Sequence, residues 1–85
     1  MPRTDRIKVV ARKAPIVMNA AKIINEKHEN KEITIEEAYE AMVKFAKSCN
    51  FKVFWFDIDD LLRQNYETEK WFWLVRRVRN TIHEW

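Results

Sequence analysis

The clearest hydrophobic pattern in the chain lies between residues 34 and 50. Thr34 stands three residues before Glu37, the spacing of a capping box, in which each side chain accepts a hydrogen bond from the backbone N–H of the other residue. The pattern predicts a helix that begins after Thr34 and ends near Asn50. Its apolar residues recur at alternating spacings of three and four, as on the buried side of a helix: Ile35, Ala38, Met42, Phe45 and Cys49, with Tyr39 and Ala46 beside them.

Two further helices are predicted toward the C-terminus. Asp57 is expected to cap a helix that runs to Asn65, and the helix dipole favours the acids of its first turn, Asp59 and Asp60. Thr68 is expected to cap a last helix that continues to the end of the chain. The apolar side of this last helix consists of Trp71, Leu74, Val75, Val78, Ile82 and Trp85. The opposite side presents Trp73, Arg76, Arg77 and Asn80, with Arg79 and His83 at its flank.

The pattern in the N-terminal third is less clear. Residues 1–13 alternate weakly, which suits a short strand or a basic arm, and the local sequence does not decide between the two. Pro15 fits the first position of a helix, where its missing N–H costs nothing, so we expect a helix from there to about Glu29. The side of this helix that should meet the core carries Ile16, Ala20, Ile23, Ile24 and Lys27.

The aromatic segment 51–56 has no helical period, so it is expected to be extended or a short strand. It could pair with residues 6–12 in a small two-stranded element. The other predicted elements are helices, and the absence of glycine disfavours the tight turns of β-hairpins. The fold class is therefore expected to be mainly α: a small orthogonal bundle of about four helices.

Length and composition indicate a single domain. A chain of 85 residues has room for one hydrophobic core, and its 47% hydrophobic and 34% charged residues are typical of a folded chain rather than a disordered one. No apolar run approaches the roughly 20 residues that span a bilayer, and the N-terminus lacks the pattern of a signal peptide. We therefore expect one cytoplasmic domain, with an arm or strand at 1–13 and a helical core at 14–85.

Residue types that carry catalysis are sparse. Without glycine the chain cannot form the glycine-rich loops that bind nucleotide phosphates. His28 and His83 lack a partner at helical spacing, and Cys49 is the only cysteine, so local metal motifs and disulfides are not expected. An EF-hand beginning at Asp57 would need glutamate at its twelfth position, where Thr68 stands. We expect no enzyme activity, no catalytic residues, no metal and no cofactor.

Charge and aromatic residues are the remaining sources of function. The net charge is +3, but basic residues dominate segments 1–13 and 61–85, whereas acids dominate 34–60. One small core cannot easily enclose all eleven aromatic residues. Trp55 and Trp73 lie out of phase with their apolar neighbours, so they are expected either to be exposed, as in a binding hot spot, or to pack against the N-terminal segment. Five aromatic residues are assigned to the core: Tyr39, Phe45, Phe54, Phe56 and Trp71.

From Thr34 onward the expected order is helix, short extended segment, helix, turn and helix, and the chain FDIDDLLRQNYETEKWFWLVRRVRNTI ends in an arginine-rich helix. This order resembles the helix-turn-helix core of winged-helix DNA-binding domains. The resemblance matches residues 54–56 to the first strand, 57–65 to the supporting helix and 68–83 to the recognition helix. It implies a wingless variant, or a plain three-helix core with an extra N-terminal helix, because the sequence reaches Trp85 without a hairpin after the last helix.

Two hypotheses for function follow. The first is a DNA-binding regulator of transcription, in which the last helix and the N-terminal arm contact duplex DNA. The contact residues would be Trp73, Arg76, Arg77, Arg79 and Asn80 on the helix and Arg3, Arg6, Lys8, Arg12 and Lys13 on the arm. The second is a protein-interaction module, such as a viral or mobile-element inhibitor or adaptor. It would bind through Trp55, Trp73, Glu36, Glu37 and Glu40. No membrane partner is expected, and a homodimer is possible.

Overall fold

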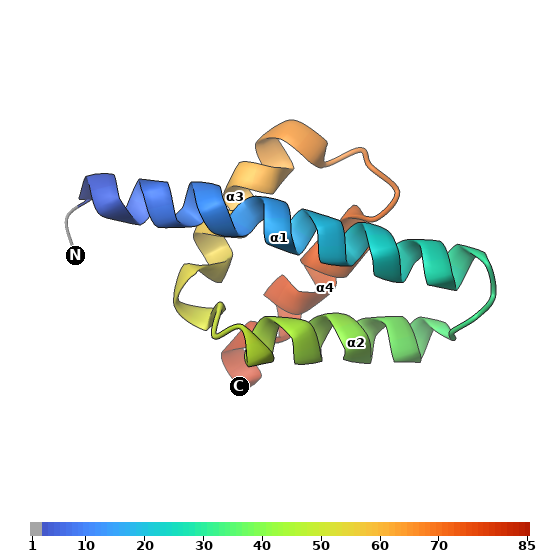
Figure 1. Ribbon diagram of the computed structural model, residues 1–85. Helices are drawn as coiled ribbons and strands as arrows, with labels where there is room; N and C mark the ends of the chain where they lie inside the picture. The colour runs from blue at the N-terminus through green and yellow to red at the C-terminus, as the bar shows by residue number, and fades with distance from the viewer. Residues whose placement is uncertain (1–2) are drawn as a thin grey trace.

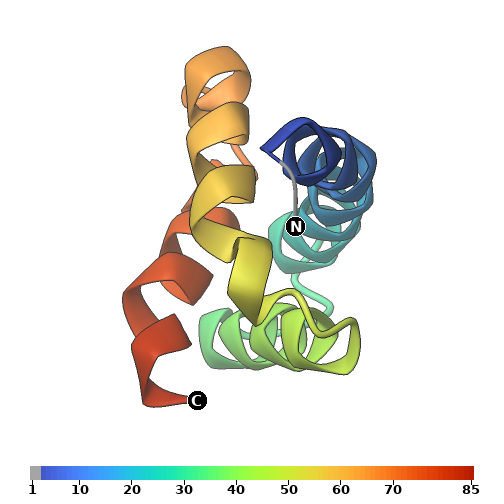
Figure 2. The same cartoon turned by 90° about the vertical axis from the view of Figure 1, so that its left-hand side faces the viewer.

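The computed structural model describes the backbone of residues 3–85 and the side chains of residues 5–85. It contains four α-helices, α1 (Arg3–Glu29), α2 (Ile35–Ser48), α3 (Trp55–Tyr66) and α4 (Phe72–Thr81), and two 3-10 turns, η1 (Lys52–Phe54) and η2 (Ile82–Glu84). Helices α1 and α2 lie side by side, and α3 and α4 form a second layer that crosses them (Figures 1 and 2). The mainly helical bundle is confirmed. The two-stranded element is wrong, since residues 3–85 contain no strand.

Helix α2 begins as its sequence predicts. The Thr34 hydroxyl accepts a hydrogen bond from the backbone N–H of Glu37 at 3.1 Å, and the Glu37 carboxylate accepts one from the backbone N–H of Thr34 at 2.9 Å. Asn50 follows the helix in the left-handed region, with φ of 56°. The buried seam is narrower than expected, because Ala38, Met42 and Ala46 are enclosed while Ile35 is exposed.

Helix α1 is the largest difference from the sequence prediction. Residues 3–13 are neither a strand nor an arm: the helix runs from Arg3 to Glu29, with Pro15 inside it. Pro15 removes one helical hydrogen bond, but it lies on the exposed side, where such bonds are weakest. A buried seam of small residues continues in phase on both sides of the proline and packs on the other helices. It consists of Val10, Ala14, Val17 and Ala21.

The predicted core side of α1 is wrong for Ile16 and Ile23, whereas Ala20 and Ile24 do pack against the core. Ile16 and Ile23 are exposed by 48% and 56% of their surface, because the buried seam faces a direction about one residue away around the helix. Small side chains on the buried side allow α1 to approach α2 and α3 closely. Ile16 and Ile23 are thereby left on the outside of the bundle.

Residues 52–56 of the aromatic segment are helical rather than extended. Phe51 is buried ahead of η1, and α3 begins at Trp55, so Asp57 lies in the first turn instead of capping the helix. Trp55 is fully buried and starts the apolar period that continues with Ile58 and Leu62, which is why the helix begins there. Phe56, assigned to the core from the sequence, is 48% exposed.

Helix α4 is shorter than expected. It starts at Phe72 rather than after Thr68, and the chain closes with η2 instead of continuing the α-helix. Its apolar face is as predicted, with Leu74, Val75 and Val78 completely buried. One core contains residues from all four helices. None of the helices described in residues 3–85 combines the length and apolar character needed to cross a bilayer.

Candidate interaction surfaces

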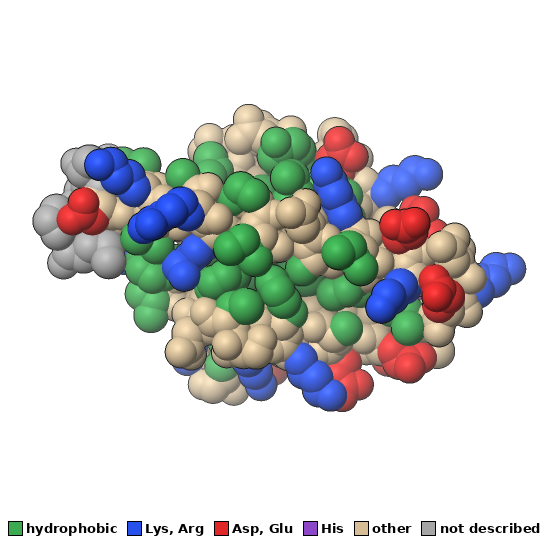
Figure 3. All heavy atoms as spheres, in the orientation of Figure 1, with side chains coloured by type: hydrophobic (Ala, Val, Ile, Leu, Met, Phe, Trp, Pro, Cys, Tyr) green, Lys and Arg blue, Asp and Glu red, His purple; other side chains and the backbone are tan. Residues whose placement is uncertain are grey.

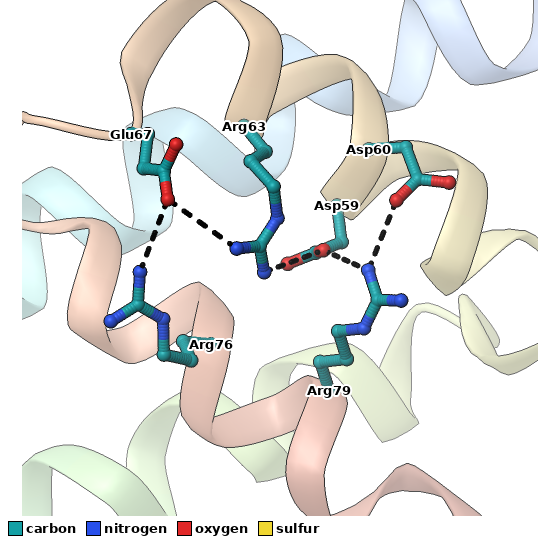
Figure 4. A network of polar contacts seen from close by, with 6 residues as sticks. All are labelled: Asp59, Asp60, Arg63, Glu67, Arg76 and Arg79. Carbon is teal, nitrogen blue, oxygen red and sulfur yellow. Dashed lines mark hydrogen bonds and ion pairs between the residues drawn. The ribbon is translucent and has the colours of Figure 1, made fainter.

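A network of charged residues joins α3 to α4 (Figure 4). Asp59 is completely buried, and its Oδ2 accepts hydrogen bonds from Arg63, one turn later at 3.2 Å, and from Arg79 of α4. Arg79 also donates to Asp60 at 3.0 Å. These hydrogen bonds to Asp59 and Asp60 raise the pKa of Arg79, which shows that they favour its charged form. The network therefore fixes how α4 sits against α3.

The other arginines of α4 also have partners within the chain. Arg76 lies 3.7 Å from the Glu67 carboxylate, and its guanidinium stacks over the ring of Phe72 at 5.6 Å. Arg77 stacks over Tyr39 of α2, 4.6 Å from the ring centroid. A guanidinium that turned toward DNA would lose these contacts. The predicted DNA-contacting arginines of α4 thus serve, in this structure, to connect α4 with its neighbours.

Trp73 is half-buried between three helices rather than displayed to solvent. Its indole N–H donates to the Oδ1 atom of the buried Asn25 at 2.7 Å. The ring also makes edge contacts with His28 and Tyr39, each at 5.3 Å between centroids. Asn80, the remaining predicted residue of this face, is exposed. Trp55 is buried, so its predicted exposure is wrong.

The basic residues predicted for the N-terminal arm lie along the first half of α1. Arg6 pairs with Asp57 at 2.7 Å and donates to the backbone oxygen of Val53 at 3.2 Å. The Lys13 ammonium lies over the ring of Phe51, 4.5 Å from its centroid. Lys8 and Arg12 are exposed, and no carboxylate of the described side chains comes within ion-pair distance of either. The side chain of Arg3 lies outside the described residues.

The acids of α2 lie at two neighbouring hollows, one lined by Glu36 and Glu40 and the other by Glu37 and Glu40. Glu37 completes the capping box, and Glu40 pairs with Lys44 at 3.4 Å. Glu36 lines a groove of about 560 Å³ between α2 and α4, whose walls include Tyr39 and Trp85. Among the side chains of residues 5–85, no three His, Cys, Asp or Glu residues gather closely enough to hold a metal ion.

An apolar surface contains three residues of α1 that were predicted to face the core, Ile16, Ala20 and Ile23. It runs along the outside of α1 and comprises Val9, Ile16, Ala20 and Ile23, called the α1 stripe. Hydrophobic side chains gather along the middle of the face formed by α1 and α2, with basic residues toward the N-terminal end of α1 (Figure 3). The spacing of seven between Val9, Ile16 and Ile23 was the signal in the sequence for such a stripe.

Two shallow hollows lie beside the α1 stripe. One, of about 400 Å³, is lined by Val9, Arg12, Lys13 and Ile16. The other, of about 320 Å³, lies where α1 meets α2, with Ile24 of α1 among its walls, and also carries lysines and glutamates. The exposed isoleucines project from this face, and the hollows lie beside them. Side chains of a partner would fit into these hollows.

No protein-family model, no curated protein and no solved structure matches this chain. The resemblance to winged-helix domains therefore stays a prediction. The strand that the resemblance placed at residues 54–56 is wrong, because these residues end η1 and begin α3. A function is therefore inferred from the exposure and charge of the surfaces described above.

Proposed function

We propose that the chain is a non-enzymatic protein-binding module and that the α1 stripe is its binding surface. The observation that carries the proposal is the exposure of Ile16 and Ile23, two large aliphatic side chains two turns apart on a helix whose other side is fully packed. Apolar surface contributes roughly 25 cal/mol per Å² when it is removed from water. A partner that covers the stripe gains this free energy without any rearrangement of the core.

The spacing of the stripe favours a helical partner. Val9, Ile16 and Ile23 form a straight row, and the positions between them, Lys13 and Ala20, complete an alternation of four and three residues. Helices that pack against one another use this alternation, since it keeps one seam facing the partner over many turns. An amphipathic helix laid along α1 is therefore the partner that the geometry fits.

Binding of a designed helix tests this proposal. The probe is a fluorescent amphipathic peptide of three heptads, with isoleucine and leucine at the seam positions and mixed charges elsewhere. Fluorescence anisotropy should show binding to the wild type and a loss of about tenfold or more in affinity for Ile16→Asp, which places a charge in the seam. The matched control is Ile35→Asp, since Ile35 is also exposed but lies on α2. Equal affinities for the two variants would contradict the proposal.

DNA binding is a second candidate, supported by the basic residues of α1 that have no charged partner. Lys8 and Arg12 lie one turn apart and are exposed, as contacts to phosphate require. The predicted interface then moves from α4 to the first half of α1. Anisotropy with a random-sequence duplex at about 50 mM salt should show weak binding that Lys8→Ala with Arg12→Ala reduces more than Arg76→Ala with Arg77→Ala. Absence of binding by the wild type would end this candidate.

A further inference from the structure

A second row of residues runs beside the α1 stripe and carries opposite charges at its two ends. Arg12, Asn19 and Glu26 stand seven residues apart, so they follow the same flank of the helix. All three side chains are exposed. Neither Arg12 nor Glu26 has an ion-pair partner among the described side chains. The row is positive at its start, neutral at its middle and negative at its end.

We propose that the partner of the α1 stripe is a second copy of this chain, with the two α1 helices antiparallel around a two-fold axis beside Asn19. This inference rests on the proposed function. A two-fold axis at this point brings Arg12 of each copy to Glu26 of the other and sets the two Asn19 side chains together. When one copy of the row is reversed against the other, each positive end therefore meets a negative end. A two-fold interface between identical chains requires such self-complementarity.

The same axis also matches the apolar residues of the stripe. It places Ile16 of one copy opposite Ala20 of the other, so a large side chain meets a small one in both halves of the interface. Ile23 comes to lie opposite Lys13. The Lys13 ammonium already leans over the ring of Phe51, which leaves its aliphatic stem to cover the isoleucine.

A parallel arrangement is excluded by charge. Two parallel α1 helices in register would set Lys13 against Lys13 inside the seam, and the flanks that carry Arg12 and Glu26 would lie on opposite sides of the interface, where they cannot pair. Like charges in contact oppose association, whereas the antiparallel arrangement separates the two lysines and adds two Arg12–Glu26 pairs. Orientation is therefore specified by the charges, and affinity comes from the isoleucines.

Analytical ultracentrifugation of the full chain tests the inference. The wild type should pass from the monomer mass of 10.4 kDa to twice that mass as its concentration rises through the micromolar range. Ile16→Asp should remain monomeric, while Ile35→Asp, the control on α2, should dimerise like the wild type. Far-ultraviolet circular dichroism verifies that each variant is folded.

Charge reversal tests the orientation separately. Each dimer contains the Arg12–Glu26 pair twice, so Arg12→Glu or Glu26→Arg alone should weaken dimerisation by about tenfold. The two substitutions together should restore it to within about threefold of the wild type, because each pair is then reversed and intact. Two weakened single variants without restoration in the double variant would overturn the antiparallel pairing.

The inference and the proposed function fail in different ways. A wild type that stays monomeric at about 0.5 mM overturns self-association. If the designed peptide still binds such a monomer, and Ile16→Asp abolishes that binding, the stripe remains a binding surface for another helix. If the wild type neither dimerises nor binds the peptide, both are overturned.

Discussion

In the interface between α3 and α4, Asp59 is fully buried and held by two arginines, whereas on the outer side of α1 Arg12 and Glu26 are exposed and unpaired. The apolar residues differ in the same way: Leu74 of α4 is enclosed, and Ile23 of α1 is half exposed. Charges and aliphatic groups that meet inside one chain stabilise its fold. The same groups left on one helix face are available to stabilise a complex.

The largest contrast between the two regions should be in stability after truncation of an aliphatic side chain. Leu74→Ala removes three heavy atoms from a fully buried site and should lower the free energy of unfolding by about 2 to 5 kcal/mol. Ile23→Ala, at a concentration where the chain is monomeric, should lower it by less than about 1 kcal/mol. Urea denaturation followed by circular dichroism measures both. Similar losses would mean that the α1 stripe is part of the core.

Removal of one acid from each region should sharpen the contrast in electrostatics. Asp59→Ala leaves Arg63 and Arg79 without their shared carboxylate and should cost about 2 kcal/mol, less than for a wholly enclosed pair because both arginines are about a third exposed. Glu26→Ala should change the stability of the monomer by no more than about 0.5 kcal/mol. The same urea titrations measure both variants. If Asp59→Ala left the free energy of unfolding unchanged, the network would not contribute to the stability of the fold.

A smaller effect is expected where α4 meets α1. Trp73→Phe keeps the aromatic contacts with His28 and Tyr39 but removes the donor to Asn25, whose Oδ1 lies in a buried residue. The loss of this hydrogen bond should cost about 1 kcal/mol. Thermal unfolding should show the decrease, and Asn80→Ala, at an exposed position of the same helix, is the control that should leave the midpoint unchanged.

The parts of the fold that the sequence predicted depend on local interactions. Thr34 and Glu37 are three residues apart, so their capping box could be recognised without knowledge of the rest of the chain, and it is present. The apolar face of α4 was equally local. The start of α3 could not be predicted from local sequence. Trp55 lies within an aromatic run, and the helical period of α3 can be recognised only from Trp55 onward.

Helix α1 shows why the sequence pattern predicted the wrong side of a helix to face the core. The core side was predicted at Ile16, Ala20, Ile23, Ile24 and Lys27, but the apolar residues of α1 that the bundle buries fully are valines and alanines, because close approach of the helices needs small side chains. The pairing of Asp59 with Arg63 has helical spacing and was accessible from the sequence. Its pairing with Arg79, 20 residues away, depends on how two helices pack.

The central claim, that the α1 stripe is a binding surface, is tested most directly by the methyl resonances of isoleucine during dilution of the wild type. Isoleucine occurs on the stripe at Ile16 and Ile23, on α2 at Ile35 and in the core at Ile58. As the concentration falls through the micromolar range, the methyl shifts of Ile16 and Ile23 should change together along one dissociation curve, while those of Ile35 and Ile58 stay constant. Shifts that are independent of concentration at Ile16 and Ile23, with no change when the designed helical peptide is added, would contradict the claim.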